Sequence, residues 1–378
     1  MSFPTKAWKN GDAGKTPLSA AAIVDLERRV TDYTDASVAV VKEAPLNVEY
    51  PEYGADGTGV KASDAAFGKA IAALPAEGGE IFAPRHYKLT EALKAEGRRS
   101  IRIGGCGGLT AGNEPASRIL FTQGGASPAV DAKSAVGICF ADLTVYYSNE
   151  TFTGFLVDLS HGKAATDSSF GVFERCQFAG LAVRSGMAFN LDQAINMTFR
   201  DCYFQNFDVA ARGQEKAGRY SNSIAFDRCT FAGMKTIPAK NAGEAWEFRN
   251  CTFESLNGGN AGAYSSDAGV LAAGLKFDNC WFGDSTTATG TWVLFRGKGL
   301  YLGGGSLGSG ALGLSVPDTT SKGITVGDGL RLYSIKDGIR LEAGVSGYTI
   351  GGYSNDATGK KVSLDGGATD AGGGFLHD

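Results

Sequence analysis

The sequence has little of several features that mark common functional classes. Its 36 basic and 40 acidic side chains leave a net charge of −4, which gives no reason to expect binding to nucleic acid or to an anionic membrane surface. Its three histidines, His86, His161 and His377, lie far apart, and no Cys/His spacing typical of a metal site occurs. No apolar run is long enough to span a membrane, and the opening MSFPTKAWKNGD lacks the apolar segment of a signal peptide. We therefore expect no metal, no cofactor and no membrane insertion, and synthesis in a cytoplasm without a leader.

A six-residue phrase, Phe-x-x-Cys-x-Phe, occurs five times. Its cysteines, 26, 27, 22 and 29 residues apart, are Cys176, Cys202, Cys229, Cys251 and Cys280. A constant phrase at a variable interval is typical of a solenoid whose strands repeat while its loops vary. Phenylalanine favours strands, and six residues are too few for a helical repeat. The phrase therefore predicts a parallel β-helix with one coil per repeat.

The phrase also predicts which side chains form the core. Alternate residues of a strand face opposite sides, and stacked coils place equivalent residues above one another at about 4.8 Å. The first Phe, the Cys and the last Phe then form three interior columns. The outward position between Cys and the last Phe is occupied by Gln177, Tyr203, Thr230, Thr252 and Trp281.

Two residues separate the first Phe from the Cys, one more than simple alternation allows. The position immediately before the Cys predicts a bend in the left-handed backbone conformation, which Asn and Asp tolerate and Arg does not favour. This position is occupied by Arg175, Asp201, Arg228, Asn250 and Asn279. The position immediately after the first Phe alternates in charge from coil to coil and predicts an exterior ladder of ion pairs. This position is occupied by Glu174, Arg200, Asp227, Arg249 and Asp278. Carboxylates in that ladder have a structural role, which argues against a catalytic one.

The cysteines total seven, and five of them fall in one interior column. A buried cysteine usually behaves as a small apolar side chain with an inert thiol. We expect free thiols, and disulfides between neighbouring coils are the alternative.

The first 45 residues have a different character from the coils. Ser19 has the chemistry of a helix cap, and the apolar residues Ile23, Leu26, Val30 and Tyr33 follow at helical spacing until Pro45. A lone amphipathic helix of this length is marginal in water, so its apolar stripe needs a partner.

The segment after Pro45 reads as turn, helix, turn and strand: Tyr53-Gly-Ala-Asp-Gly-Thr, a helix led by Asp64, Gly78-Gly and then Pro84-x-x-Tyr87. It resembles the N-terminal cap of the pectate-lyase superfamily of right-handed parallel β-helices, except that Arg85-His86 stands where Pro and Gly are usual. The resemblance covers residues 50–355 together with the coils. It implies an all-β, right-handed, single-stranded parallel β-helix with an N-terminal helical cap, and it says little about chemistry.

The stretch from Trp8 to Glu27, with its Pro17-Leu-Ser-Ala phrase, is similar to the opening of minor tail proteins of phages that infect actinobacteria. Combined with a β-helix body, it resembles a phage tail spike or receptor-binding protein. Such proteins are usually homotrimers, which would give the apolar stripe of the first helix a partner. The resemblance implies a virion location, attachment to other tail or baseplate proteins through residues 1–45, and a host-surface polysaccharide as the ligand.

These observations divide the chain into four parts. Residues 1–45 are predicted as an attachment or oligomerisation segment, 46–99 as the cap, 100–355 as the β-helix and 356–378 as a glycine-rich tail.

Whether such a body cuts its ligand depends on acids outside the ion-pair ladder. Hydrolases hold two carboxylates roughly 5 to 10 Å apart. Candidates in the variable turns are Asp158, Asp167, Asp192, Asp208, Glu215, Glu254, Asp267 and Asp284. Of these the sequence favours Asp192 as acid with Glu215 as its partner, against the alternative that all are solvated loop acids. The lone histidine in this region, His161 near Asp158, has no evident nucleophile.

A body that binds without cutting would use exposed aromatics and loops on a rigid scaffold. The candidates are Tyr203, Tyr264, Trp281 and Trp292, with oligomer contacts as the alternative use of such residues. The sequence thus favours a glycan-binding attachment protein, then a polysaccharide depolymerase (hydrolase or lyase), then a structural tail-tip spacer. The short excursions between coils argue mildly against a deep groove within one chain.

Overall fold

A computed structural model describes residues 45–108, 114–162, 167–214, 220–254, 262–283, 290–327, 329–351, 354–355 and 362–364. From Leu46 onward these residues belong to one compact unit. The predicted attachment segment 1–45, apart from its last residue, lies outside the described part, as does most of the predicted tail 356–378.

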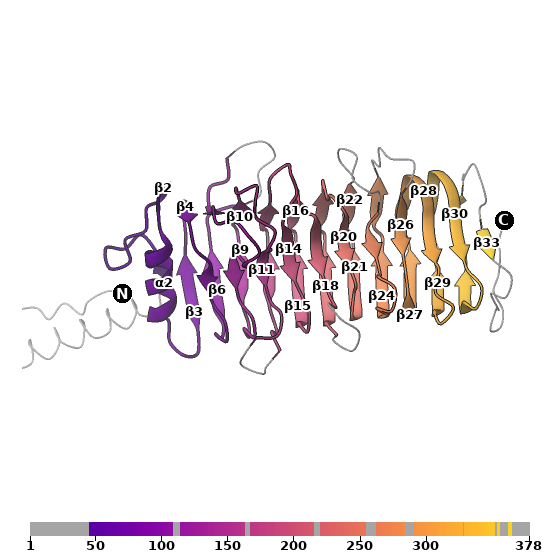
Figure 1. The fold of residues 1–378 in the computed structure, drawn as a ribbon, viewed down its shortest axis with the longest axis horizontal. Coiled ribbons are helices and arrows are strands. Elements are labelled where there is room, and N and C mark those ends of the chain that lie inside the picture. Colours follow the sequence, from indigo (N-terminus) through magenta and orange to yellow (C-terminus); the bar gives the residue numbers. More distant parts are fainter. Residues whose placement is uncertain are drawn as a thin grey trace, which may run out of the picture. The chain divides into compact units, whose positions relative to one another are not determined.

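Parallel strands stack into a coiled solenoid (Figure 1). One face is a 12-stranded sheet, here called sheet A. Its strands are β1 (Leu46–Asn47), β3 (Gly79–Phe82), β6 (Ile101–Gly104), β9 (Cys139–Ala141), β12 (Val172–Glu174), β15 (Ile195–Arg200), β18 (Asn222–Asp227), β21 (Glu244–Arg249), β24 (Ala272–Asp278), β27 (Gly297–Gly303), β29 (Lys322–Val326) and β31 (Ser346–Ile350).

The remaining 21 strands form two ladders that share two long strands. The first ladder, here called ladder B1, comprises β2 (Thr58–Ala62), β4 (His86–Leu89), β7 (Arg118–Phe121), β10 (Thr144–Tyr147), β13 (Gln177–Ala179), β16 (Tyr203–Gln205), β19 (Thr230–Ala232), β22 (Thr252–Glu254), β25 (Trp281–Gly283), β28 (Ser306–Val316), β30 (Arg331–Leu341) and β32 (Ser354–Asn355). The second, ladder B2, comprises β5 (Leu93–Lys94), β8 (Val130–Asp131), β11 (Phe155–Asp158), β14 (Met187–Asn190), β17 (Val209–Arg212), β20 (Ile237–Lys240), β23 (Tyr264–Ser265), β26 (Thr291–Leu294) and β33 (Val362–Leu364), joined to the first by β28 and β30. The strand β33 falls within the segment that the sequence predicts as a tail.

The predicted interior columns are present, because the phrase keeps its register from coil to coil. The rings of Phe199, Phe226 and Phe248 stack with centroids 4.6 and 4.7 Å apart and planes within 9°. The second Phe column stacks in the same way, with Phe204 and Phe231 at 4.8 Å. Both columns and the cysteines are buried.

The cysteine column has a hydrogen-bonding role that the sequence did not reveal. Each thiol from the second phrase onward donates to the carbonyl of the first Phe one coil earlier: Cys202 to Phe173 at 3.3 Å and Cys251 to Phe226 at 3.4 Å are examples. The small thiol therefore fills the core and also partners a backbone carbonyl beside the bend. All seven cysteines are free, as predicted.

The predicted bend is confirmed in every phrase, including those with arginine: φ is 50° at Arg175, 52° at Asp201, Arg228 and Asn279, and 53° at Asn250. The arginines occupy this conformation while paired with aspartates one coil earlier, Arg175 with Asp142 and Arg228 with Asp201. The exterior ladder is also present, with Arg200 bound to Glu174 at 2.9 Å and Arg249 to Asp227 at 3.1 Å.

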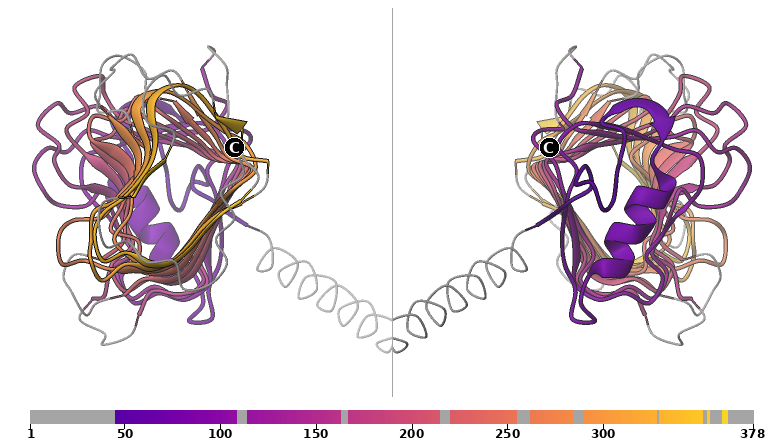
Figure 2. Two further views of the ribbon diagram at one scale, coloured as in Figure 1. Left: turned by 90° about the vertical axis from the view of Figure 1, so that its right-hand side faces the viewer. Right: turned by 90° about the vertical axis from the view of Figure 1, so that its left-hand side faces the viewer.

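Helix α2 (Asp64–Ala73) is the helix that the sequence predicts after Pro45, and it lies across the N-terminal end of the coiled interior (Figure 2). Its buried face includes Phe67, whose ring meets Tyr87 edge-on at 5.4 Å. Asp64 accepts hydrogen bonds from the backbone of Thr90 and Glu91, which ties the helix to the first coils. The helix therefore shields apolar side chains that the first coil would otherwise expose. None of the described helices is long and apolar enough to cross a membrane.

Candidate functional site

The outer face of ladder B1 carries a groove with a volume of about 1140 Å³. It follows from strand register, because alternate residues of β10, β13, β16 and β19 face outward and align in two columns. The first column includes Thr144, Gln177, Tyr203 and Thr230, and the second includes Tyr146, Ala179 and Gln205. A groove is therefore present within one chain, although the loops between the coils are short.

Small residues form the floor of the groove. Ala179 and Gly180 lie between the coils that carry the two tyrosines. A Cβ at Gly180 would come within 2.4 Å of the Tyr147 ring and 2.5 Å of the Asn206 carbonyl oxygen, so a larger residue would force neighbours apart. Glycine at this position therefore lets the backbone pass directly over the buried Tyr147 ring.

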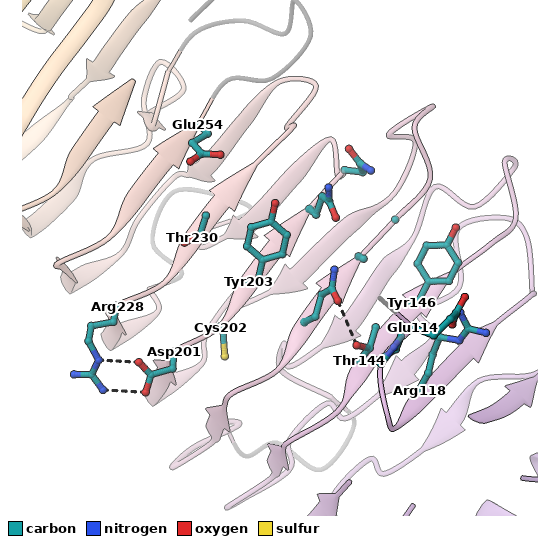
Figure 3. Close-up of a pocket in the computed structure, with 16 residues that line it drawn as sticks. Glu114, Arg118, Thr144, Tyr146, Asp201, Cys202, Tyr203, Arg228, Thr230 and Glu254 are labelled. Carbon is teal, nitrogen blue, oxygen red and sulfur yellow. Dashed lines mark hydrogen bonds and ion pairs between the residues drawn. The ribbon is translucent and has the colours of Figure 1, made fainter. Parts of the chain in front are cut away.

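The two tyrosines stand on the same face, with one strand between them (Figure 3). Tyr146 lies toward the end that holds Glu114 and Arg118, and Tyr203 lies toward Glu254. From the coil spacing, they are separated by about 10 Å along the solenoid axis. Partial burial raises the pKa of each phenol, and the nearby Glu254 carboxylate raises that of Tyr203 further. Both hydroxyls therefore stay protonated at neutral pH and can donate hydrogen bonds.

Amides and hydroxyls supply most of the other polar groups in the groove. Gln177, Gln205 and Asn206 carry both donors and acceptors. The Thr144 hydroxyl lies 2.6 Å from the Gly108 carbonyl oxygen and 3.4 Å from Gln177 Oε1. Neutral groups that both donate and accept match the hydroxyl groups of a sugar.

The charged groups are mostly paired and nearly cancel. Asp201 binds Arg228 through both carboxylate oxygens, at 2.7 and 2.9 Å, and this hydrogen bonding lowers the pKa of Asp201. Arg118 Nη1 lies 3.0 Å from Glu114 Oε2. With Glu254, the described lining carries three carboxylates and two guanidiniums. This balance favours a neutral ligand over a polyanion.

The carboxylates of the described lining are not arranged as a hydrolase pair. Asp201 and Glu254 are two coils apart, about 10 Å along the axis, and also four residues apart along the strand direction. Asp201 is held by Arg228, and Glu114 lies at the far end of the groove. The described geometry therefore fits binding better than acid–base cleavage.

The favoured catalytic candidates are not brought together in this groove. Asp192 lies in the turn after β14, is 2% exposed and is not among the lining residues. Its predicted partner Glu215 lies outside the described residues. Burial is an unfavourable setting for an acid that must reach a glycosidic bond, and the assignment of this pair stays a prediction.

Of the wider set of acids, Glu254 does line the groove. The His161 side chain contacts another acid, with Nδ1 3.2 Å from Asp167 Oδ1.

The four predicted aromatics divide into two pairs. Tyr203 and Trp281 face outward and are half-buried, as the phrase predicts. Tyr264 and Trp292 are buried in the core, so the expectation that they are exposed was wrong. Their polar atoms are satisfied inside: Tyr264 Oη lies 2.7 Å from Ser266 Oγ, and Trp292 Nε1 donates to the Gly308 carbonyl at 2.9 Å.

Sequence reasoning missed Tyr146, Gln205 and the amide of Asn206. The stretch Ile138-Cys139-Phe140-x-x-Leu143-x-Val145 is a degenerate version of the phrase, and it gave a signal for Tyr146. Val145 aligns with Phe178 in the register, which places Tyr146 on the outer face. No cluster of three metal-binding side chains occurs in the part of the chain that the structure describes.

No protein-family model matches the chain, and no curated protein sequence is similar to it. Solved structures are similar in fold. The tailspike protein of Acinetobacter phage vB_ApiP_P1 matches with a TM-score of 0.52 at 15% identity, over 86% of this chain and 60% of the tailspike. The A-module of the mannuronan C-5 epimerase AlgE4 of Azotobacter vinelandii matches with a TM-score of 0.50 at 14% identity, over 86% of this chain and 100% of the module. At these identities the likeness concerns the fold alone, and with the parallel ladders it identifies the chain as a right-handed parallel β-helix protein.

Proposed function

We propose that the protein is a phage tail spike or minor tail protein that attaches to a neutral host-surface polysaccharide through the groove on ladder B1. The observation that carries the proposal is the groove itself. It combines two half-buried tyrosines with amide and hydroxyl groups on a rigid sheet. An aromatic ring stacks on the apolar face of a sugar, and amides bind its hydroxyls in either direction.

The virion role rests on two further supports. The opening from Trp8 to Glu27 resembles that of phage minor tail proteins, and a phage tailspike shares the fold. On this proposal residues 1–45 join other tail or baseplate proteins and the β-helix acts as a homotrimer, without nucleic acid or a membrane as partner. A tail assembled with a chain that lacks residues 1–45 would contradict the attachment role.

Retention on immobilised polysaccharides tests the glycan proposal. Suitable probes are arabinogalactan, galactomannan, dextran, a second α-glucan and a β-1,3-glucan. We expect Tyr203→Ala to weaken binding by about 10- to 100-fold, the range of one buried aromatic contact. The matched control is Tyr301→Ala, because Tyr301 is an outward tyrosine on sheet A, away from the groove. Equal binding by the two variants, or no retention of the wild-type protein, would contradict the proposal.

The second candidate is a depolymerase that works in the same groove. The observation that favours it is the Glu254 carboxylate beside Tyr203. If Glu254 is the acid, Glu254→Gln abolishes the release of oligosaccharides and preserves binding. A spacer role would leave every groove variant without effect on attachment.

A further inference from the structure

Two aromatic side chains beyond the groove each lie over a glycine. Trp281 faces outward from β25, and a Cβ at Gly283 would lie 2.2 Å from Cζ2 of its ring. Tyr333 faces outward from β30, and a Cβ at Gly308 would lie 2.2 Å from Cζ of its ring. Each ring therefore covers backbone where any other residue would place a side chain. Both side chains are half-buried, which leaves part of each ring accessible on the outer face.

The two rings belong to one surface. Strands β25 and β28 pair with Trp281 opposite Ser306 and Phe282 opposite Leu307. The next residue of each strand is a covered glycine, so Gly283 and Gly308 lie side by side on adjacent strands. The Arg331 guanidinium lies 5.6 Å from the centroid of the Tyr333 ring. We call the surface of Trp281, Tyr333 and Arg331 the aromatic platform.

The platform continues the groove. Glu254, at the end of the groove, pairs in register with Gly283, which lies under the Trp281 ring. The outward column that holds Tyr203 and Thr230 runs through Thr252 to Trp281. A linear chain that leaves the groove along the solenoid axis would therefore reach the indole within one coil, about 5 Å.

An aromatic ring over a glycine can also serve stability alone, by covering exposed backbone. The molecule provides a comparison for that explanation. On sheet A, the Tyr301 ring lies over Gly303 in the same way, with Oη 2.3 Å from the Cβ position, but sheet A does not carry the groove. A purely structural role predicts that Trp281, Tyr333 and Tyr301 behave alike in a binding assay.

We propose that the aromatic platform is a second glycan-binding surface, which contacts sugar rings of the same polysaccharide after it leaves the groove. The inference rests on the proposed function and extends it: the ligand is a long, linear, neutral glycan bound parallel to the solenoid axis. Accessible ring area favours the apolar faces of pyranose rings, and Arg331 can donate to their hydroxyls.

A size ladder of oligosaccharides tests the inference, prepared by partial acid hydrolysis of whichever neutral polysaccharide retains the wild-type protein. We expect Trp281→Ala and Tyr333→Ala each to weaken binding of long fragments about tenfold or more and to leave disaccharide and trisaccharide binding unchanged. Tyr203→Ala should weaken binding of both sizes, and Tyr301→Ala of neither.

The outcomes separate this inference from the proposed function. Unchanged binding of long fragments by Trp281→Ala and Tyr333→Ala overturns the platform, while a loss in Tyr203→Ala still supports the groove. If no polysaccharide retains the protein, both fail.

A second measurement covers the case of poorly folded variants. In a Trp8→Phe background three tryptophans remain, and Trp246 and Trp292 are buried. Iodide quenching then reports on Trp281. Saturating long fragments should reduce the quenching and short fragments should not; quenching that no fragment changes contradicts the inference.

Discussion

The central coils and the C-terminal coils have the same backbone but different sequences. The central coils, from β12 to β25, use stacked phenylalanines, a cysteine column and non-glycine residues at the bends. The C-terminal coils, from β27 to β31, use Leu302, Val326 and Ile350 in the Phe column and Gly304 and Gly329 at the bend. A β-helix therefore fixes backbone geometry and side-chain direction, while several combinations of residues can satisfy both.

A second column of left-handed residues makes the contrast sharper. It runs along sheet A through Phe170, Asn196, Ser223 and Ala245, and continues as glycine at Gly274, Gly299, Gly323 and Gly347. A left-handed non-glycine residue costs about 1 kcal/mol or more. In this column the coils up to β21 carry that cost together with a continuous aromatic core, and the coils from β24 onward use glycine instead.

The largest expected effect is in the aromatic core. Phe226→Ala removes a ring that stacks on both neighbours, at 4.6 and 4.7 Å, and should lower the free energy of unfolding by about 3–5 kcal/mol. Leu302→Ala, at the same column of the C-terminal coils, should cost about 2–5 kcal/mol. Urea unfolding measures both. Phe170→Ala is the control, because that side chain is 61% exposed. A smaller loss for Phe226→Ala than for Leu302→Ala would contradict the importance of ring stacking.

The thiols provide the next test, since the cysteine column exists only in the central coils. Burial raises the pKa of Cys176 and Cys229, and the thiolate is the reactive form. We expect iodoacetamide to modify the exposed Cys106 first, Cys139 more slowly, and the five column cysteines only after unfolding. Mass analysis of the peptides gives the order of modification. Rapid native modification of Cys229 would show that the column is open to solvent.

A matched pair of substitutions tests the left-handed column. Ala245→Gly should stabilise the protein by up to about 1 kcal/mol, because glycine adopts the left-handed conformation without strain. Gly299→Ala should destabilise it by about 1 kcal/mol, because alanine is strained in the left-handed conformation. The new Cβ would make only ordinary contacts, the nearest 3.4 Å from Gly274, so no steric clash adds to this cost. Thermal unfolding measures both. Changes of the same sign would mean that neighbouring contacts decide stability at these positions.

The smallest expected effect is the pH dependence that two arginine–aspartate pairs at the bends contribute to stability. Hydrogen bonds from Arg175 and Arg228 lower the pKa of Asp142 and Asp201. Their stabilisation is present above the ordinary aspartate pKa of about 3.9 and is lost as pH falls through the lower folded values. The Arg175→Gln/Arg228→Gln variant should be less stable than wild type at pH 7, by at most about 1 kcal/mol for each exposed pair, and the difference should close near pH 2. A difference that persists in acid would assign the loss to packing.

The central coils were predictable because the phrase repeats and strand alternation assigns each position a direction. Tyr203 and Trp281 were placed on the outer face in this way. The buried positions of Tyr264 and Trp292 were not, because both lie in ladder B2, where the sequence lacks a repeated phrase. The groove could not be predicted either. It depends on the register between coils of unequal length, which no short motif records.

The most direct test of the central claim, that the groove binds a glycan without cutting it, measures retention and cleavage in one sample. The purified full-length protein is incubated with a polysaccharide that retains it, and the supernatant is examined by mass spectrometry for released oligosaccharides. We expect retention, weakened by Tyr203→Ala, without new fragments. Discrete fragments that disappear in Glu254→Gln would contradict it and make the protein a depolymerase.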